Sequence, residues 1–152
     1  MWQSAKAGLL SRFPSVSPCT PSPLRSSLST VAYSYRELIV WQKAKSLAVH
    51  VYNLTESFPR TEIYGLTSQS RRAAVSVISN IAEGQGRLTS GEFLHFLGLA
   101  RGSLTELEAQ LSIALDLKYL DPASHDRIGG ELYQVLGLLN RLIEAIKRKR
   151  KA

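Results

Sequence analysis

The clearest pattern of apolar and polar positions lies in residues 64–87, which we predict to form one helix. At about 100° per residue, its polar side chains fall on one stripe and its apolar side chains fill a much wider arc. Because this arc is wider than one core requires, we expect the helix to contact more than one neighbour. Arg71 lies in the apolar arc, where its stem can cover apolar surface while its guanidinium reaches a partner. Gly84 and Gly86 are expected to end the helix in a left-handed conformation.

Two further amphipathic segments lie on either side of this helix. Ser34 precedes a segment with one apolar face, which is predicted to stay helical to Phe58 and to stop at Pro59. Thr89 and Glu92 have the spacing of a capping box, so a third helix is expected to begin there. Its apolar stripe is the longest in the chain and continues for more than six turns.

A fourth helix is predicted from Asp121-Pro122, since proline at the first helical position loses no hydrogen bond. Its apolar face continues to Ile146. No strand-like alternation and no internal repeat occurs in the sequence. Four amphipathic helices with short connections predict an all-α, up-down-up-down antiparallel four-helix bundle over residues 33–147, followed by a flexible basic tail over 148–152.

The side of the third helix opposite its apolar stripe carries small residues, Gly98, Gly102 and Ala109. Each glycine inside a helix costs about 1 kcal/mol relative to alanine. Such residues indicate either the close approach of another backbone or a local bend. Together with the wide apolar arc of residues 64–87, they lead us to expect a homo-oligomer.

Residues 1–32 differ in composition from the rest of the chain. They contain four of the six prolines and eight serines but no acidic residue, so we expect a disordered extension. An organelle transit peptide and a start codon placed too far upstream are the alternatives. The single cysteine, Cys19, fits a reducing compartment, and no apolar run is long enough to span a membrane. The sequence therefore favours a cytoplasmic location.

The formal net charge of the 152 residues is +7, but it is concentrated at the two ends. Residues 1–36 and 147–151 carry only basic charges, whereas residues 37–146 contain slightly more acidic than basic side chains. A basic balance favours polyanionic partners such as nucleic acid.

No catalytic motif is present, so we expect no enzyme activity and no cofactor. His50, His95 and His125 lie on three different segments, and the exposed His50 is interpreted as solvated surface. Inward-facing glutamates bind metals in some helical bundles, but the Glu-x-x-His pairs that those sites need are missing. The trio considered for such a site consists of Glu83, Glu106 and Glu108. For Glu106 and Glu108 we expect ion pairs instead, with Arg71, Arg72 or Arg101.

The basic side chains provide a candidate nucleic-acid interface. Arginine suits bidentate phosphate contacts, and a basic tail can follow a phosphate backbone. Basic residues at a helix C-terminus also complement the helix dipole, which is an alternative reason for their presence. The candidate residues are Arg71, Arg72, Arg87, Arg101, Lys147, Arg148, Lys149, Arg150 and Lys151.

Several short runs resemble a known family when they are taken in order. They are YREL (35–38), YGLT (64–67), RRAA (71–74), SNIAEG (79–84) and GSLTELE (102–108). These runs resemble the four-helix-bundle proteins encoded in intervening sequences of bacterial large-subunit ribosomal RNA. The accessory variability protein of diversity-generating retroelements is related to that family. The resemblance covers about residues 34–146.

The resemblance implies a non-enzymatic homopentamer with a basic surface that binds RNA. In the retroelement branch it implies binding of nucleic acid together with a reverse transcriptase. Two hypotheses therefore stand: an oligomeric RNA-binding bundle, and a scaffold that docks a protein partner such as a reverse transcriptase. The residues that carry the family pattern are Tyr64, Gly65, Asn80, Glu83, Gly84, Gly102, Glu106 and Glu108.

Overall fold

The computed structural model describes residues 34–151, which form four long α-helices and three short 3-10 helices with no strand among them. Residues 1–33 and Ala152 lie outside the described part, and so does the predicted extension over 1–32. The elements are η1 (Tyr35–Glu37), α1 (Ile39–Leu54), η2 (Thr55–Ser57), η3 (Arg60–Glu62), α2 (Leu66–Gln85), α3 (Ser90–Asp116) and α4 (Pro122–Lys151).

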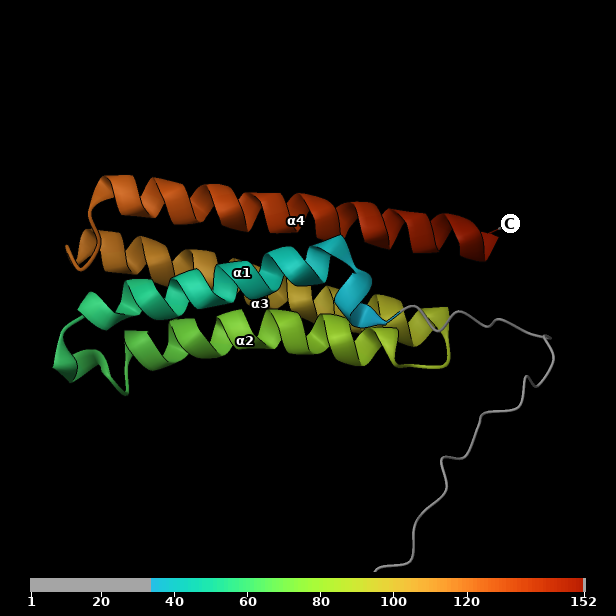
Figure 1. Ribbon diagram of the computed structural model, residues 1–152, viewed down its shortest axis with the longest axis horizontal. Coiled ribbons are helices and arrows are strands. Elements are labelled where there is room, and N and C mark those ends of the chain that lie inside the picture. Colours follow the sequence, from blue (N-terminus) through green and yellow to red (C-terminus); the bar gives the residue numbers. More distant parts are fainter. Residues whose placement is uncertain (1–33, 152) are drawn as a thin grey trace, which may run out of the picture. The chain divides into compact units, whose positions relative to one another are not determined.

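Successive α-helices run in opposite directions (Figure 1). Helix α1 packs against α2 and α4, and α3 packs against the same two helices. This arrangement confirms the predicted up-down-up-down four-helix bundle.

The core is built from aliphatic side chains at helical spacing on all four helices. Each fully buried leucine, isoleucine or valine stabilises the fold by about 1.5–3 kcal/mol through the apolar area it removes from water. The buried core residues of the four helices are Val40, Ala44, Leu47, Ala48 and Val51 on α1; Ala73, Ala74, Val77 and Ile81 on α2; Leu97, Ala100, Leu104, Leu107, Leu111 and Ala114 on α3; and Ile128, Leu132, Val135, Leu139 and Ile143 on α4.

The wide apolar arc of α2 is explained within the chain. Helix α2 lies between α1 and α3, so its buried side chains serve two neighbours, as predicted. Because these two helices cover most of the arc, the arc no longer requires a second subunit. The small residues of α3 behave differently: a Cβ added at Gly98 or Gly102 would meet nothing within 4 Å. Support for an oligomer therefore moves from α2 to this open side of α3.

The first helix ends earlier than Phe58. Helix α1 stops at Leu54, and the 3-10 turn η2 follows. The Thr55 hydroxyl donates to the carbonyl oxygens of Val51, at 2.8 Å, and Tyr52, at 3.1 Å. Such local hydrogen bonds compete with helix continuation. Phe58 is nevertheless buried, because the chain turns it back into the core.

The end of α2 also differs from the prediction. Gly86 does cap the helix, but with φ of −77° it is right-handed and not left-handed. Gly84 does not end the helix: it is a buried residue within α2. A Cβ at Gly84 would lie 2.7 Å from the Phe96 Cβ and 3.0 Å from the Phe93 ring. This glycine is therefore needed for the close packing of α2 on α3.

Both predicted helix starts are confirmed. The Thr89 hydroxyl oxygen accepts a hydrogen bond from the Glu92 backbone N–H at 3.2 Å at the start of α3. At the start of α4, the Asp121 carboxylate accepts from the Ser124 backbone N–H at 2.9 Å. Hydrogen bonding from Ser124, first through its side chain and then through its backbone, lowers the pKa of Asp121 below the usual 3.8.

The left-handed residue that follows helix α3 is not glycine. Lys118 has φ of 61°, in the left-handed region that L-residues rarely adopt. The Lys118 N–H donates to the Leu115 carbonyl and the Tyr119 N–H to the Ala114 carbonyl, both at 2.9 Å. This pair of hydrogen bonds is the Schellman motif, which satisfies the last carbonyl groups of the helix.

Helix α4 continues through Lys151, so the predicted boundary at residue 147 is wrong and residues 148–151 are not a flexible tail. Lysine and arginine favour helix, and their charges at a C-terminus complement the helix dipole. Among residues 34–151, no helix is both long and apolar enough to cross a membrane.

Candidate nucleic-acid interface

Arg71 fastens α2 to the end of α1. Its Nε donates to the Thr55 hydroxyl at 2.8 Å, and its Nη2 donates to the Tyr52 carbonyl at 3.2 Å. The guanidinium carbon lies 4.8 Å from the centre of the Tyr52 ring, a cation–π contact. The stem covers apolar surface and the charged end finds a partner, as its place in the apolar arc predicted. Since these contacts occupy the guanidinium, Arg71 has a structural role in the bundle.

Arg72 and Arg101 are available to a ligand. Both side chains are exposed, and neither forms an ion pair among residues 34–151. Arg72 donates only to the side-chain oxygen of Gln69, at 2.8 Å. A guanidinium without a carboxylate partner keeps its full charge for an external anion.

Arg87 lies just after α2 and contacts residues near the end of that helix. Its guanidinium forms an ion pair with Glu83, one helical turn earlier, and lies 4.7 Å from the centre of the Phe96 ring. The Glu83 carboxylate offsets the positive charge of Arg87, which would otherwise be available to bind a phosphate. Of the four candidate arginines before α4, only Arg72 and Arg101 therefore remain as strong candidates.

Asn80 belongs to a polar contact between α2 and α3. Its side-chain amide donates to the Ser76 carbonyl at 2.8 Å and to the Ser76 hydroxyl at 3.1 Å. The Ser103 hydroxyl on α3 donates to the same Ser76 hydroxyl at 2.9 Å. Asn80 therefore supports Ser76, which makes the contact to α3, while Gly84 of the same SNIAEG run allows α3 to pack closely.

The connection between α1 and α2 combines a cap with an exposed aromatic ring. The Glu62 carboxylate accepts from the Leu66 N–H at 2.8 Å at the start of α2. A side chain at Gly65 would displace that carboxylate and so disturb this cap. Tyr64 is 91 % exposed and the neighbouring Ile63 is 58 % exposed. These two adjacent side chains form an exposed apolar pair on the surface.

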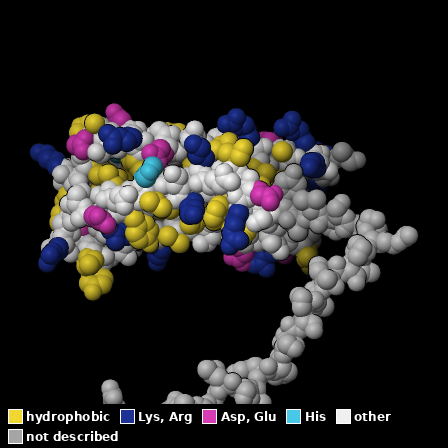
Figure 2. Space-filling model, viewed as in Figure 1, with side chains coloured by type: hydrophobic (Ala, Val, Ile, Leu, Met, Phe, Trp, Pro, Cys, Tyr) yellow, Lys and Arg dark blue, Asp and Glu magenta, His cyan; other side chains and the backbone are white. Residues whose placement is uncertain are grey.

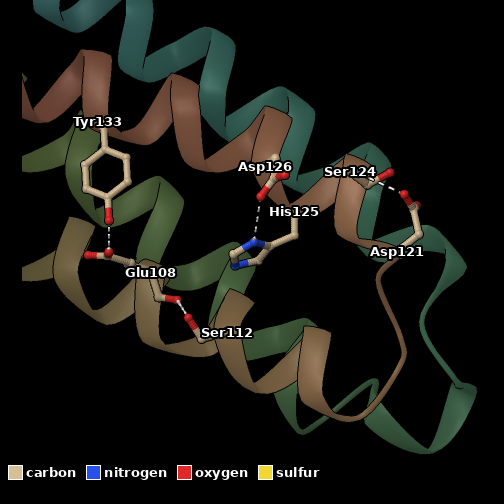
Figure 3. Close-up of polar contacts among 7 residues, drawn as sticks. All are labelled: Glu108, Ser112, Asp121, Ser124, His125, Asp126 and Tyr133. Atoms are coloured by element: carbon tan, nitrogen blue, oxygen red, sulfur yellow. Dashed lines mark hydrogen bonds and ion pairs between the residues drawn. The ribbon is translucent and has the colours of Figure 1, made fainter.

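The expected ion pairs of Glu106 and Glu108 with arginine do not form among the described residues. Glu106 accepts from the Gln110 amide at 3.1 Å. Glu108 accepts from the Tyr133 hydroxyl of α4 at 2.5 Å (Figure 3). This hydrogen bond, reinforced by the charge of Glu108, raises the pKa of Tyr133. Glu108 therefore connects α3 to α4 and does not balance an arginine.

The histidines also have definite neighbours. His50, interpreted from the sequence as solvated surface, has its Nδ1 2.6 Å from the Glu131 carboxylate of α4. This pair borders a pocket of about 300 Å³ between α1 and α4. His125 lies 3.7 Å from the Asp126 carboxylate (Figure 3). Over residues 34–151, no three His, Cys, Asp or Glu side chains gather as a metal site.

The end of α4 presents the densest basic surface of the bundle. Residues 147–151 are all exposed, and only Lys147 has a carboxylate partner there, Glu144 at 3.0 Å. Hydrogen bonding to Lys147 lowers the pKa of Glu144, and the charges of Lys147, Arg148 and Lys151 add to the effect. In Figure 2, Lys and Arg side chains follow the upper edge of the molecule over α4.

Two basic residues of α4 were missed in the sequence analysis. Arg127 and Arg141 are exposed and stand twenty-one and seven residues before Arg148, so all three share one side of the helix. The spacing was present in the sequence. The two arginines are single charges spaced along the helix, so they form no continuous basic run like that of residues 147–151.

The fold and this surface define a class: an all-α four-helix bundle with an exposed basic helix. Residues 36–141 match the family model described as 23S rRNA-intervening sequence protein, and the chain belongs to this family. Among solved structures, it resembles a protein of unknown function from the S23 ribosomal protein family of Bacteroides thetaiotaomicron. That likeness has 22 % identity and a TM-score of 0.65, and it covers 69 % of this chain and 98 % of the other. A comparison with curated proteins gave no match.

Proposed function

We propose that the chain is a non-catalytic, oligomeric RNA-binding protein of the cytoplasm. The observation that carries the proposal is the basic end of α4, where Lys149, Arg150 and Lys151 are exposed and have no carboxylate partner among residues 34–151. Charges held on a helix at fixed spacing can each contact a phosphate and release its counterions. The words "23S rRNA" in the family description make ribosomal RNA the first ligand to test.

The proposed oligomer is a homopentamer, which the resemblance to the intervening-sequence proteins implies. The open side of α3 at Gly98 and Gly102 supports an assembly, because another backbone could approach there without a clash. A ring of this kind would repeat the basic end of α4 once per subunit. Repeated weak phosphate contacts raise the overall affinity for a long polyanion.

The proposal is tested by titrating a labelled, structured fragment of 23S rRNA at physiological salt. Deleting residues 147–151 is expected to weaken binding by about tenfold or more, because several phosphate contacts are lost. Arg72→Ala and Arg101→Ala should each weaken binding and leave the fold intact. The matched control is Lys43→Ala, which removes one exposed charge from α1.

The alternative function is a scaffold that docks a protein partner such as a reverse transcriptase. The exposed Ile63 and Tyr64 side chains favour it, since apolar surface at a helix connection suits a protein contact. If the deletion and both arginine substitutions leave RNA affinity unchanged, RNA binding is wrong and the scaffold replaces it. Tyr64→Ser should then weaken capture of the partner.

A further inference from the structure

The outer side of α4 combines arginines with small residues. Its buried side packs on α1 and α3 through residues at core spacing. At about 100° per residue, the opposite side forms a stripe, which we call the outer stripe. It consists of Ala123, Arg127, Gly130, Gln134, Gly137, Arg141, Ala145 and Arg148, and the exposed Asp126 and Glu144 lie along one edge, about 20° beyond Gly137.

The three arginines of the outer stripe lie on a regular spacing. Arg127, Arg141 and Arg148 are separated by multiples of seven residues, and seven residues advance a helix by about 10 Å. From Arg127 to Arg148 the stripe covers about 31 Å. Because α4 is one continuous helix, these charges form a row that turns slowly, by about 20° for every seven residues, around one side of the helix.

None of the three arginines has a carboxylate within ion-pair distance among residues 34–151, although Arg148 lies near enough to Glu144 for its charge to lower the pKa of that carboxyl. The Arg141 Nε donates to the Gly137 carbonyl of its own helix at 3.3 Å, and the Arg148 Nε donates to the Glu144 carbonyl at 3.4 Å. Arg127 is exposed at the edge of the pocket beside His50. Among residues 34–151, none of the three forms an ion pair.

The acidic side chains of α4 have other neighbours. Glu131 pairs with His50 of α1, and Glu144 pairs with Lys147. Asp126 lies 3.7 Å from His125, on the side drawn in Figure 3. The outer stripe is therefore a row of arginines with Asp126 and Glu144 along one edge, and Glu144 is paired with Lys147.

Between the arginines, the helix backbone is uncovered. A Cβ added at Gly130 would meet nothing within 4 Å, and one at Gly137 would meet only the Arg141 guanidinium, at 3.9 Å. Each glycine costs about 1 kcal/mol of helix stability relative to alanine, and no packing within the described residues 34–151 requires it here. Small residues at these positions let a bulky ligand approach the helix between the charges.

The stripe lacks the side chains that bind unpaired bases. Single-stranded nucleic acid is held by stacking of its bases on aromatic rings, and the outer stripe has none. The nearest aromatic on α4, Tyr133, donates its hydroxyl to Glu108. Double-stranded RNA is recognised by its shape and by contacts to its phosphates, which arginines on a straight helix can supply.

We infer that the outer stripe of α4 is the surface on which this protein holds the phosphate backbone of double-stranded RNA. The inference rests on the proposed RNA binding and assigns that binding to a ligand class and a helix face. The inference adds Arg127 and Arg141 to the residues proposed to bind RNA, which already include the basic end of α4.

The test compares an RNA hairpin stem with an unpaired strand of equal length, using the full chain. The wild type is expected to bind the stem more tightly. Replacing Arg127, Arg141 and Arg148 together by Gln should weaken stem binding by about tenfold or more and reduce the salt slope by about one per arginine. The matched control replaces Lys43, Lys45 and Arg60 by Gln, which removes the same charge from exposed positions outside α4. This control variant should bind the hairpin stem almost as tightly as the wild type does.

A second variant alters shape without altering charge. Gly130→Leu with Gly137→Leu fills the space between the arginines, and the open surroundings allow the helix to keep its fold. Stem affinity should fall severalfold while thermal stability is maintained or rises. This combination separates a binding face from a merely structural role.

The outcomes separate this inference from the proposed function. If the wild type binds the stem but neither the arginine nor the glycine variant weakens it, the inference is wrong and RNA binding stands. Tighter binding of the unpaired strand would also overturn it. If the glycine variant changes the mass of the oligomer, the stripe is a subunit contact and the inference is again wrong. No binding of either RNA by the wild type removes both proposals.

Discussion

At the residue scale, two glycines on different helices have opposite surroundings. Gly84 is buried, and a Cβ there would lie 2.7 Å from the Phe96 Cβ, closer than real Cβ atoms approach. Gly129 on α4 has nothing within 4 Å of that position. The same substitution to alanine should therefore act in opposite directions at the two sites.

We expect Gly84→Ala to reduce the free energy of unfolding by about 1–3 kcal/mol, because α2 and α3 must move apart to admit the methyl group. Gly129→Ala should raise it by about 1 kcal/mol, since alanine favours helix. Urea denaturation of both variants measures these changes. An unchanged midpoint for Gly84→Ala would mean that α2 and α3 pack less closely than described.

Some of these residue-level contacts could be predicted from the sequence. The place of Arg71 in an apolar arc predicted a reaching guanidinium, and the Thr55 and Tyr52 contacts confirm it. The role of Gly84 was misread because a glycine near a helix end fits both a cap and a close contact. Only the position of Phe96 on the next helix decides between them.

At the element scale, the start of α4 depends on one exposed carboxylate. Asp121 accepts from Ser124, and its pKa is lowered below 3.8, so the folded state favours its charged form. A lowered folded pKa gives stability that is present above the unfolded value and is lost as the pH falls through the folded value.

We therefore expect Asp121→Ala to lower the melting temperature by a few degrees at neutral pH, and expect this difference to shrink as the pH falls well below 3.8. Asp121→Asn keeps an acceptor for the N–H groups but cannot titrate. It should show a smaller loss, and the wild type should approach it on acidification. A difference between wild type and Asp121→Ala that stays constant with pH would contradict this account of the cap.

The helix starts were predictable because their signals are local. Thr89 with Glu92, and Asp121 before Pro122, place an acceptor or a fixed φ at the first turn. Helix ends were harder to predict. Helix α3 ends at Asp116, and Lys118 after it takes a left-handed conformation that its residue type does not favour, held by the two backbone hydrogen bonds of the Schellman motif. Helix α4 extends to Lys151 because no residue there stops it.

At the scale of the whole molecule, the open side of α3 is the best candidate for a subunit contact. Light scattering at micromolar concentration should give a mass of several chains. Gly102→Trp should reduce that mass while circular dichroism keeps its helical signal, because the added ring projects into open space on the isolated bundle. A monomeric wild type would contradict the proposed assembly.

The fold was predictable at this scale, whereas the charge pattern was only partly so. The apolar periods fixed the helix pairing, and the basic run at residues 147–151 was evident. Which arginines remain unpaired depended on contacts between helices and turns, such as Glu83 with Arg87 and Arg71 with Thr55. Sequence periodicity predicts the side of the helix on which a residue lies. It does not predict which side chain of a neighbouring helix or turn contacts that residue.

The central claim, RNA binding through unpaired basic side chains, is tested most directly by the salt dependence of affinity. A structured 23S rRNA fragment is titrated with the full chain at several salt concentrations. The account predicts that log affinity falls linearly with log salt, by about 0.7–0.9 for each phosphate contacted, and that deleting residues 147–151 makes the slope shallower. An affinity that does not change with salt, or a slope that the deletion leaves unchanged, would contradict it.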